Sequence, residues 1–172
     1  MRTSILIKTA DADDVAILAG LIRDSYRNVA QRFGLTPENC PKHPSNCTDD
    51  WIRNDFDRGV SFYLQEHNGR PAGCAALESP EPALGYLERL AVLPPSRHQG
   101  FGRRLVDHVF RQAGIAGIHK ISIGIIAAQT ELKNWYQKIG FVEGDTKEFS
   151  HLPFSVTFML CHLAGQGGID ET

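Results

Sequence analysis

Two kinds of hydrophobic spacing alternate along this chain. Apolar residues that recur every three or four positions predict helices at 11–34, 49–59, 101–113 and 132–140. Shorter apolar runs, β-branched or alternating, predict strands at 4–8, 61–66, 72–77, 84–93, 120–127, 141–149 and 154–160. This order of elements predicts the α/β class, with one mixed sheet of about six to seven strands and helices on both faces.

Two of the predicted strands carry more specific expectations. Residues 120–127 read KISIGIIA, a nearly continuous apolar run that favours a central strand covered on both faces. In the last strand, alternate residues from Phe154 to Leu160 are apolar and share one face, and an exposed final strand suits pairing across a homodimer. We expect one domain at 1–163, followed by a disordered, glycine-rich tail at 164–172.

Composition narrows the class of protein. The 172 residues include 18 Lys and Arg against 20 Asp and Glu, a formal charge of -2, so we expect no nucleic acid as the main partner. No apolar run reaches the roughly 18 residues that cross a bilayer, and the first residues do not resemble a signal peptide. We therefore expect no membrane partner. The four cysteines are spread widely, which favours reduced thiols in a cytoplasmic protein.

The most informative stretch is 90–105, which reads LAVLPPSRHQGFGRRL. A strand stopped by two prolines leads into a loop, and glycines 100 and 102 lie at the first turn of the next helix. Unpaired N–H groups at a helix start, the helix dipole and the arginines at 97, 103 and 104 suit a phosphate group. The spacing matches neither a P-loop nor a dinucleotide fingerprint. The sequence thus predicts a phosphate or pyrophosphate cradle of another kind.

In this stretch L-A-V-x-P is followed by R-x-x-G-x-G, and L-x-x-W-Y-x-x-x-G-F follows at 132–141. The two motifs together resemble the GNAT superfamily of acetyl-CoA-dependent N-acetyltransferases. The resemblance implies acetyl-CoA as cosubstrate and no required metal. It assigns the coenzyme A pyrophosphate to the backbone amides of Arg97, His98, Gln99, Gly100, Phe101, Gly102 and Arg103. It assigns the pantetheine arm to backbone groups of Leu90, Ala91 and Val92 and to the side chain of Gln129, which stands where the family commonly has asparagine.

Acetyl transfer to an amine needs a base, because a primary amine is protonated at neutral pH. Glu88 has the same strand parity as Leu90 and Val92, so we expect it to face the cofactor and to act as this base through a water. The alternative is a solvent-facing carboxylate paired with Arg89 or Arg97. Tyr136 stands at the family's tyrosine position and is expected to give the leaving thiolate a proton or a hydrogen bond, although its place on an apolar stripe also suits a core residue.

The acceptor is less well specified by the sequence. In the GNAT fold the segment between the first two helices overhangs the substrate, so His43 is expected near the acceptor, and His151 is a second candidate. Either histidine is an alternative base. We expect the acceptor to be the amine of a small molecule or of a peptide.

Two other functions compete with an acetyltransferase. A non-catalytic module that binds or senses acyl-CoA would keep the phosphate cradle without needing both Glu88 and Tyr136. A zinc-stabilised interaction domain would use Cys40, His43 and Cys47, which lie within eight residues of one another.

Overall fold

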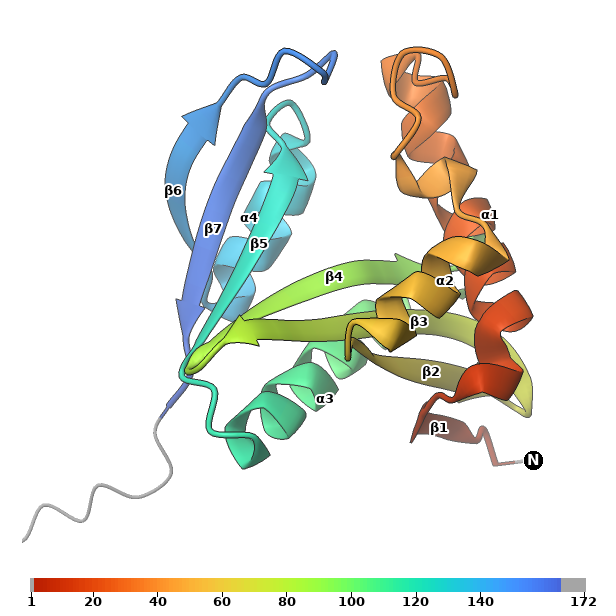
Figure 1. Ribbon diagram of the computed structural model, residues 1–172. Coiled ribbons are helices and arrows are strands. Elements are labelled where there is room, and N and C mark those ends of the chain that lie inside the picture. The colour runs from red at the N-terminus through yellow and green to blue at the C-terminus, as the bar shows by residue number, and fades with distance from the viewer. Residues whose placement is uncertain (1, 165–172) are drawn as a thin grey trace, which may run out of the picture.

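The computed structural model describes residues 2–164, which form one seven-stranded sheet with the order β1-β2-β3-β4-β5-β7-β6 (Figure 1). The strands are β1 (Ile5–Thr9), β2 (Ser61–His67), β3 (Arg70–Glu81), β4 (Leu84–Val92), β5 (Lys120–Ile126), β6 (Val142–Lys147) and β7 (Val156–His162). The helices are α1 (Val15–Phe33), α2 (Asp49–Asp57), α3 (Phe101–Ile115) and α4 (Thr130–Ile139), with short 3-10 turns η1 (Ala12–Asp14), η2 (Pro44–Asn46) and η3 (Pro94–Ser96). The predicted α/β class, mixed sheet and order of elements are confirmed.

The ends of the first two helices follow from local sequence. The Asp11 side chain accepts the Asp13 N–H at 2.9 Å, and the Asp14 carboxylate accepts the Asp11 N–H at 3.0 Å, which caps the start of η1 and α1. The helix ends at Gly34, which adopts the left-handed conformation with φ 63°. The Thr48 hydroxyl accepts the Trp51 N–H and so caps the start of α2.

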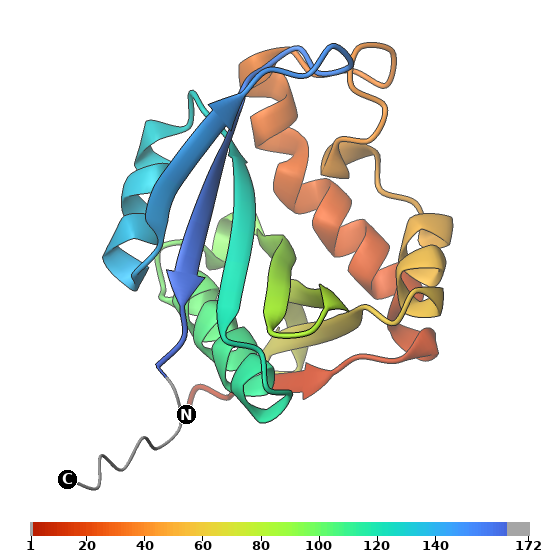
Figure 2. The ribbon, with the colours of Figure 1, turned by 60° about the vertical axis from the view of Figure 1, so that its left-hand side comes forward.

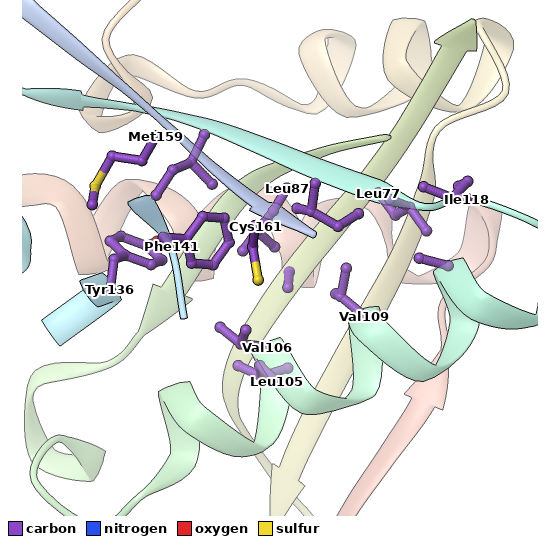
Figure 3. Packing of buried hydrophobic residues seen from close by; sticks show 14 of the residues in the cluster. Leu77, Leu87, Leu105, Val106, Val109, Ile118, Tyr136, Phe141, Met159 and Cys161 are labelled. Carbon is purple, nitrogen blue, oxygen red and sulfur yellow. The ribbon is translucent and has the colours of Figure 1, made fainter. Parts of the chain in front are cut away.

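Helices cover both faces of the sheet (Figures 1 and 2). On one face, α1 and α2 pack on Phe62, Leu64 and Cys74 of β2 and β3. On the other face, α3 and α4 pack on the intervening positions Tyr63 and Ala75, and Figure 3 shows the side chains of this second cluster. The division arises because successive residues of a strand point to opposite faces.

The parallel strands β4 and β5 pair only at their beginning. Residues Leu84–Tyr86 pair with Lys120–Ser122, and beyond them the ladder between the two strands stops. From there β4 continues beside β3, while β5 pairs with β7, and Figures 1 and 2 show the two strands diverging. The divergence leaves backbone groups of both strands unpaired inside the molecule, where a ligand can use them.

The expectation that β5 is covered on both faces holds only for part of the strand. Ile121, Ile123 and Ile125 are buried on one face, whereas on the opposite face Ile126 is buried but Lys120 and Gly124 are exposed. Gly124 borders the gap that β4 leaves when it turns away.

The expectation for the last strand also needs correction. β7 lies between β5 and β6, so both of its edges are hydrogen-bonded and it cannot pair across a homodimer. Within residues 2–164 the outer strands are β1 and β6. The face of β7 that is buried carries Thr157, Met159 and Cys161, and the alternating apolar positions are on the half-buried side.

Two further expectations concern the ends of the chain and membranes. Apart from its first residue, the tail predicted at 164–172 lies outside the described residues.

Within residues 2–164, no helix combines the length and hydrophobicity needed to cross a membrane.

Candidate active site

Two cavities meet in the gap between β4 and β5. The first, which we name the loop cavity, has a volume of about 600 Å³ and lies against η3, the start of α3 and α4. The second, named the strand cavity, has a volume of about 520 Å³ and lies between β4, β5 and the end of α2. Six residues line both cavities: Tyr26, Val29, Leu90, Gln129, Leu132 and Tyr136.

The structure brings together almost all residues that were predicted to bind the cofactor. All of them line the loop cavity except Gln99, whose side-chain amide donates to the Pro95 carbonyl at 3.1 Å and so turns back onto its own loop. The predicted catalytic residues Glu88 and Tyr136 both line the strand cavity. Residues that lie far apart in the chain thus surround one continuous cleft.

The backbone at the start of α3 offers a run of free hydrogen-bond donors. Within residues 2–164, no oxygen accepts the N–H groups of residues 98–103, and the first bonded N–H is that of Arg104, which donates to Gly100 at 3.1 Å. His98 and Gly100 adopt left-handed conformations, with φ 61° and 80°. Free N–H groups and the positive end of the helix dipole together suit an anion such as a pyrophosphate.

The two glycines of this loop are needed for different reasons. Gly100 has φ 80°, a conformation that other residues adopt only with strain, and nothing lies within 4 Å of an added Cβ. Gly102 is helical, but an added Cβ would lie 3.3 Å from the indole ring of Trp135. The first glycine therefore sets the turn, and the second lets α4 approach the start of α3.

Arg97 holds the loop in place through two of its three guanidinium nitrogens. Its Nε donates to the Val92 carbonyl at 3.0 Å and its Nη2 to the Ser25 carbonyl at 2.6 Å. Its backbone N–H donates to Pro94 at 3.3 Å, so the prediction that this amide binds pyrophosphate is not supported. The side chain instead joins the end of β4 to α1.

Backbone groups at the end of β4 face the gap, but the carbonyls are already occupied. The Leu90 carbonyl accepts the Tyr26 hydroxyl at 2.7 Å, and the Val92 carbonyl accepts Arg97. The N–H and C=O of one strand residue point to the same side, so the Val92 N–H also faces the gap. Ala91 has the opposite parity and its backbone points to β3, contrary to its predicted role as a backbone ligand.

Glu88 lies on the opposite face of β4 from the one predicted. Ala91 pairs with Cys74 and Glu88 with Ala76, so two residues of β4 stand opposite one residue of β3. This bulge, in which Arg89 has φ 52°, reverses the side-chain parity between Leu90 and Glu88. Glu88 therefore shares the face of β3 that α1 and α2 cover, and it reaches the acceptor side of the cleft.

The surroundings of Glu88 suit a base that works near neutral pH. Burial, together with the neighbouring carboxylate of Glu78, raises the pKa of Glu88 to about 7, and the Arg89 charge opposes this rise only in part. Within residues 2–164, Glu88 forms no ion pair with Arg89 or Arg97, so the alternative of a surface ion pair is wrong. A carboxylate with a pKa near the working pH combines availability with basicity.

Beside Glu88, a buried aspartate joins two arginines. Asp55 of α2 is 2% exposed. One of its carboxylate oxygens accepts the Arg89 Nε–H at 3.0 Å, and the other forms an ion pair with Arg58 Nη2 at 3.1 Å. Arg58 Nη2 also contacts Glu78 at 3.3 Å. The sequence analysis did not identify this cluster, because helical and strand periodicity do not show which charged residues face each other.

Tyr136 is packed in the core and also borders the cleft. It is 6% exposed, and its ring centroid lies 4.9 Å from that of Trp135 and 5.2 Å from that of Phe141. Figure 3 shows it beside Phe141 in the cluster, and it lines both cavities. Burial, and then the nearby Tyr26, raise the pKa of Tyr136 well above its usual value. The hydroxyl therefore stays protonated and can donate to a group in the cleft.

The structure separates the two candidate histidines. His43 is buried and lines the strand cavity, and burial lowers its pKa. Its Nδ1 lies 2.7 Å from the Ser45 hydroxyl and 3.3 Å from the Ser45 backbone nitrogen, so this ring nitrogen is engaged within its own loop. His151 is exposed beside Phe149 and lines neither cavity, so the expectation that it lies near the acceptor is wrong.

The cysteines of the 35–48 loop do not gather around His43. Cys40 packs with Ala30 and Leu35, whereas Cys47 belongs to the cluster under α1 and α2. Burial raises the pKa of both thiols, that of Cys47 to about 11. Among residues 2–164, no group of three metal-ligating side chains forms.

Two further aromatic residues line the cleft. Tyr26 of α1 lines both cavities. Trp135 lines the loop cavity next to Gly102. The spacing of Trp135 and Tyr136 behind the glycine loop was the available sequence signal for Trp135.

The family of the chain follows from this geometry together with a comparison of sequences. A model of the acetyltransferase (GNAT) family matches residues 24–141, which include the loop, the diverging strands and α4. The chain belongs to this family. The match confirms the predicted resemblance, and the chain carries the acyltransferase domain that the family defines.

Known proteins agree with the family and the fold. The chain is 28% identical over 138 residues to an amino-acid acetyltransferase of Neisseria meningitidis, a match that covers 80% of this chain and 27% of that protein. The chain thus spans about a quarter of the length of this relative. Two solved structures share the fold. The PaiA N-acetyltransferase of Thermoplasma acidophilum, in complex with coenzyme A, has TM-score 0.78 and 19% identity and covers 92% and 99% of the two chains. YncA of Salmonella typhimurium, with acetyl-CoA, has TM-score 0.70 and 18% identity and covers 98% and 99%.

Proposed function

We propose that this protein transfers an acetyl group from acetyl-CoA directly to the primary amine of a small molecule. One observation carries the proposal: the free N–H groups at the start of α3 open into the same cleft that Glu88 and Tyr136 line. The names of the Neisseria relative and of the two structural neighbours support the same reaction.

Acetyl-CoA fits the loop cavity by shape and by chemistry. The N–H groups of residues 98–103 suit its pyrophosphate, and the gap between β4 and β5 suits its pantetheine arm, beside Gln129 and the Val92 N–H. Bound there, acetyl-CoA supplies the thioester that donates the acetyl group. Trp135 and Gly102 would border the arm and exclude water from it.

Glu88 is the proposed base. It removes a proton from the acceptor ammonium, directly or through one water, because the neutral amine is the nucleophile. His43 lines the same side of the cleft, and its Nε2 would orient the acceptor by a hydrogen bond. The bulge at Arg89 serves this arrangement, because it places the base on the acceptor side rather than beside the pantetheine.

On the other side of the reacting atoms, the chain offers donors. The Val92 N–H faces the gap and suits the negative charge that develops on the carbonyl oxygen of the acetyl group. The Tyr136 hydroxyl, held neutral by its raised pKa, would donate a hydrogen bond to the sulfur of the leaving thiolate. These donors and Glu88 approach the gap from its two sides, as a direct transfer without a covalent enzyme intermediate requires.

The walls of the strand cavity favour a small acceptor over a peptide. Leu35 and Cys40 of the loop after α1 pack with Leu152 and Phe154 of the loop before β7, and Ile126 lies between them. This contact closes one end of the cleft, where Figure 2 shows the two loops meeting. A cavity of about 520 Å³ accommodates a metabolite-sized amine.

The experiment that tests the proposal is an assay of free coenzyme A thiol. Purified protein is mixed with acetyl-CoA and, one at a time, with amino acids, simple amines and a lysine-rich peptide. We expect thiol release that depends on a small amine, with the N-acetylated product found by mass spectrometry. Saturable binding of acetyl-CoA without turnover on any amine would replace the proposal with the acyl-CoA binding module.

A further inference from the structure

The strand cavity holds two cationic side chains beside its acid. Among the described residues that line it, the charged ones are Glu88, Arg58 and Arg89. The two arginines are not needed for proton removal by Glu88. A guanidinium presents five N–H donors in a plane and matches a carboxylate better than any other side chain does.

The two guanidinium groups contact carboxylates on the side away from the strand cavity. Asp55 and Glu78 lie outside the lining of the strand cavity, and they use only Nε of Arg89 and Nη2 of Arg58. Within residues 2–164, the other N–H groups of both guanidiniums donate to no oxygen. Both arginines therefore keep unused N–H donors. The ion pair with Asp55 fixes Arg89, which is 19% exposed, more firmly than Arg58, whose side chain is 53% exposed.

Backbone geometry also directs Arg89 to this place. Its left-handed conformation at the bulge sends the side chain toward α2, where the guanidinium lies 5.5 Å from the Trp51 ring centroid. The side chain is 19% exposed and Asp55 is nearly buried, so this ion pair is shielded from solvent. Breaking such a pair is costly, and the arrangement is thus rigid enough to define a subsite.

We infer that Arg58 and Arg89 form a subsite for a carboxylate of the acceptor, so that the acceptor carries both a primary amine and a carboxylate. The inference rests on the proposed function. The amine of such a molecule lies toward Glu88 and its carboxylate toward the arginines. The buried Asp55 is a positioning residue, because it fixes both guanidiniums without lining the cavity itself.

The first test compares matched acceptors. A panel of α- and ω-amino acids is assayed beside the corresponding carboxamides, which keep the amine and lose the negative charge. We expect kcat/KM for the best acid to exceed that of its carboxamide by roughly tenfold to a hundredfold, the value of a hydrogen bond to a charged group. Amine ionisation alone would favour the carboxamide. Loss of a nearby negative charge lowers the pKa of the amine, so a larger fraction of the carboxamide carries the neutral, nucleophilic amine at neutral pH.

The second test assigns the preference to residues. Arg58→Met should reduce the ratio of kcat/KM for acid over carboxamide by about tenfold. Arg89→Lys keeps the charge but loses the planar fork, so its ratio should fall less. The matched control is Arg53→Met, because Arg53 is also on α2, pairs with Asp49 and Asp50, and does not line the cavity. A ratio measured on one preparation does not depend on how much of the variant is folded.

The outcomes separate this inference from the proposed function. Equal use of acids and carboxamides, or an unchanged ratio in Arg58→Met and Arg89→Lys, would overturn the carboxylate subsite and leave the acetyltransferase intact. If neither the amino acids nor the carboxamides cause release of coenzyme A thiol, the proposed function is contradicted, and the subsite with it.

Discussion

The hydroxyl of Tyr26 donates to the carbonyl oxygen of Leu90 at 2.7 Å, across 64 positions of sequence. The bond joins the middle of α1 to β4 at the place where β4 leaves β5. Burial raises the pKa of Tyr26 to about 12, so the hydroxyl remains a donor at every working pH. The width of the cleft thus depends on a contact between two elements that are distant in the chain.

Tyr26→Phe removes this bond and leaves the Leu90 carbonyl without its partner. We expect the free energy of unfolding to fall by about 1 kcal/mol, measured by urea denaturation. The control is Tyr86→Phe on the same strand β4, because the Tyr86 hydroxyl forms no hydrogen bond within residues 2–164. An equal loss of stability in the two variants would show that the bond to Leu90 contributes nothing.

Glu88→Gln removes the proposed base. Because the pKa of Glu88 is about 7, the wild-type kcat/KM for the amine should rise as pH increases through 7, when the carboxylate forms. The variant should lose this rise and about two orders of magnitude in rate. Glu143→Gln, on the exposed strand β6, is the control and should keep the wild-type profile. A rise near pH 7 that persists in Glu88→Gln would assign the titration to another group.

Stability measurements on the same variant give an independent check. The pKa of Glu88 is raised in the folded state from 4.5 to about 7, so between these values the unfolded chain releases the proton more readily. The contribution of Glu88 to stability is present below pH 4.5 and is lost as pH rises through 7. The melting temperature of Glu88→Gln should therefore match the wild type at pH 4 and exceed it at pH 8.

Tyr136→Phe keeps the ring packing on Trp135 and Phe141 and deletes only the hydroxyl. We expect kcat to fall by about tenfold to a hundredfold through loss of the hydrogen bond to the leaving thiolate, with KM for acetyl-CoA and the melting temperature little changed. Steady-state kinetics with saturating amine measure the effect. An unchanged kcat in Tyr136→Phe would leave the residue with its packing role alone.

The glycines of α3 and of the loop before it form a matched series. Gly100→Ala should lower the free energy of unfolding by about 1–2 kcal/mol, because alanine is strained at φ 80°. Gly102→Ala should instead raise KM for acetyl-CoA several-fold, because the new Cβ displaces Trp135 from the loop cavity. Gly114→Ala, on open helix surface, should stabilise by about 0.5–1 kcal/mol. Denaturation and kinetics on all three test the assignment, and a KM effect in Gly114→Ala would contradict it.

The sequence by itself determined the order of elements and the place of the glycine loop at the start of α3. Caps such as Asp11 and Gly34, and the glycine loop at 97–102, depend on residues only a few positions away, so a single segment is enough to predict them. The motif at 132–141 likewise predicted the helix that carries Tyr136. Local interactions of this kind do not depend on which distant segment packs against them.

Only the tertiary structure decided which way the functional side chains point. One extra residue in β4 reverses the parity of Glu88, and neither the bulge nor its Asp55 anchor follows from strand periodicity. The same holds for Arg97, whose Nε and Nη2 donate to the carbonyls of Val92 and Ser25, and for His151, which lies away from the cleft. These placements depend on contacts between segments tens of residues apart, and such contacts form only when the strands have taken their register and the helices have packed on them.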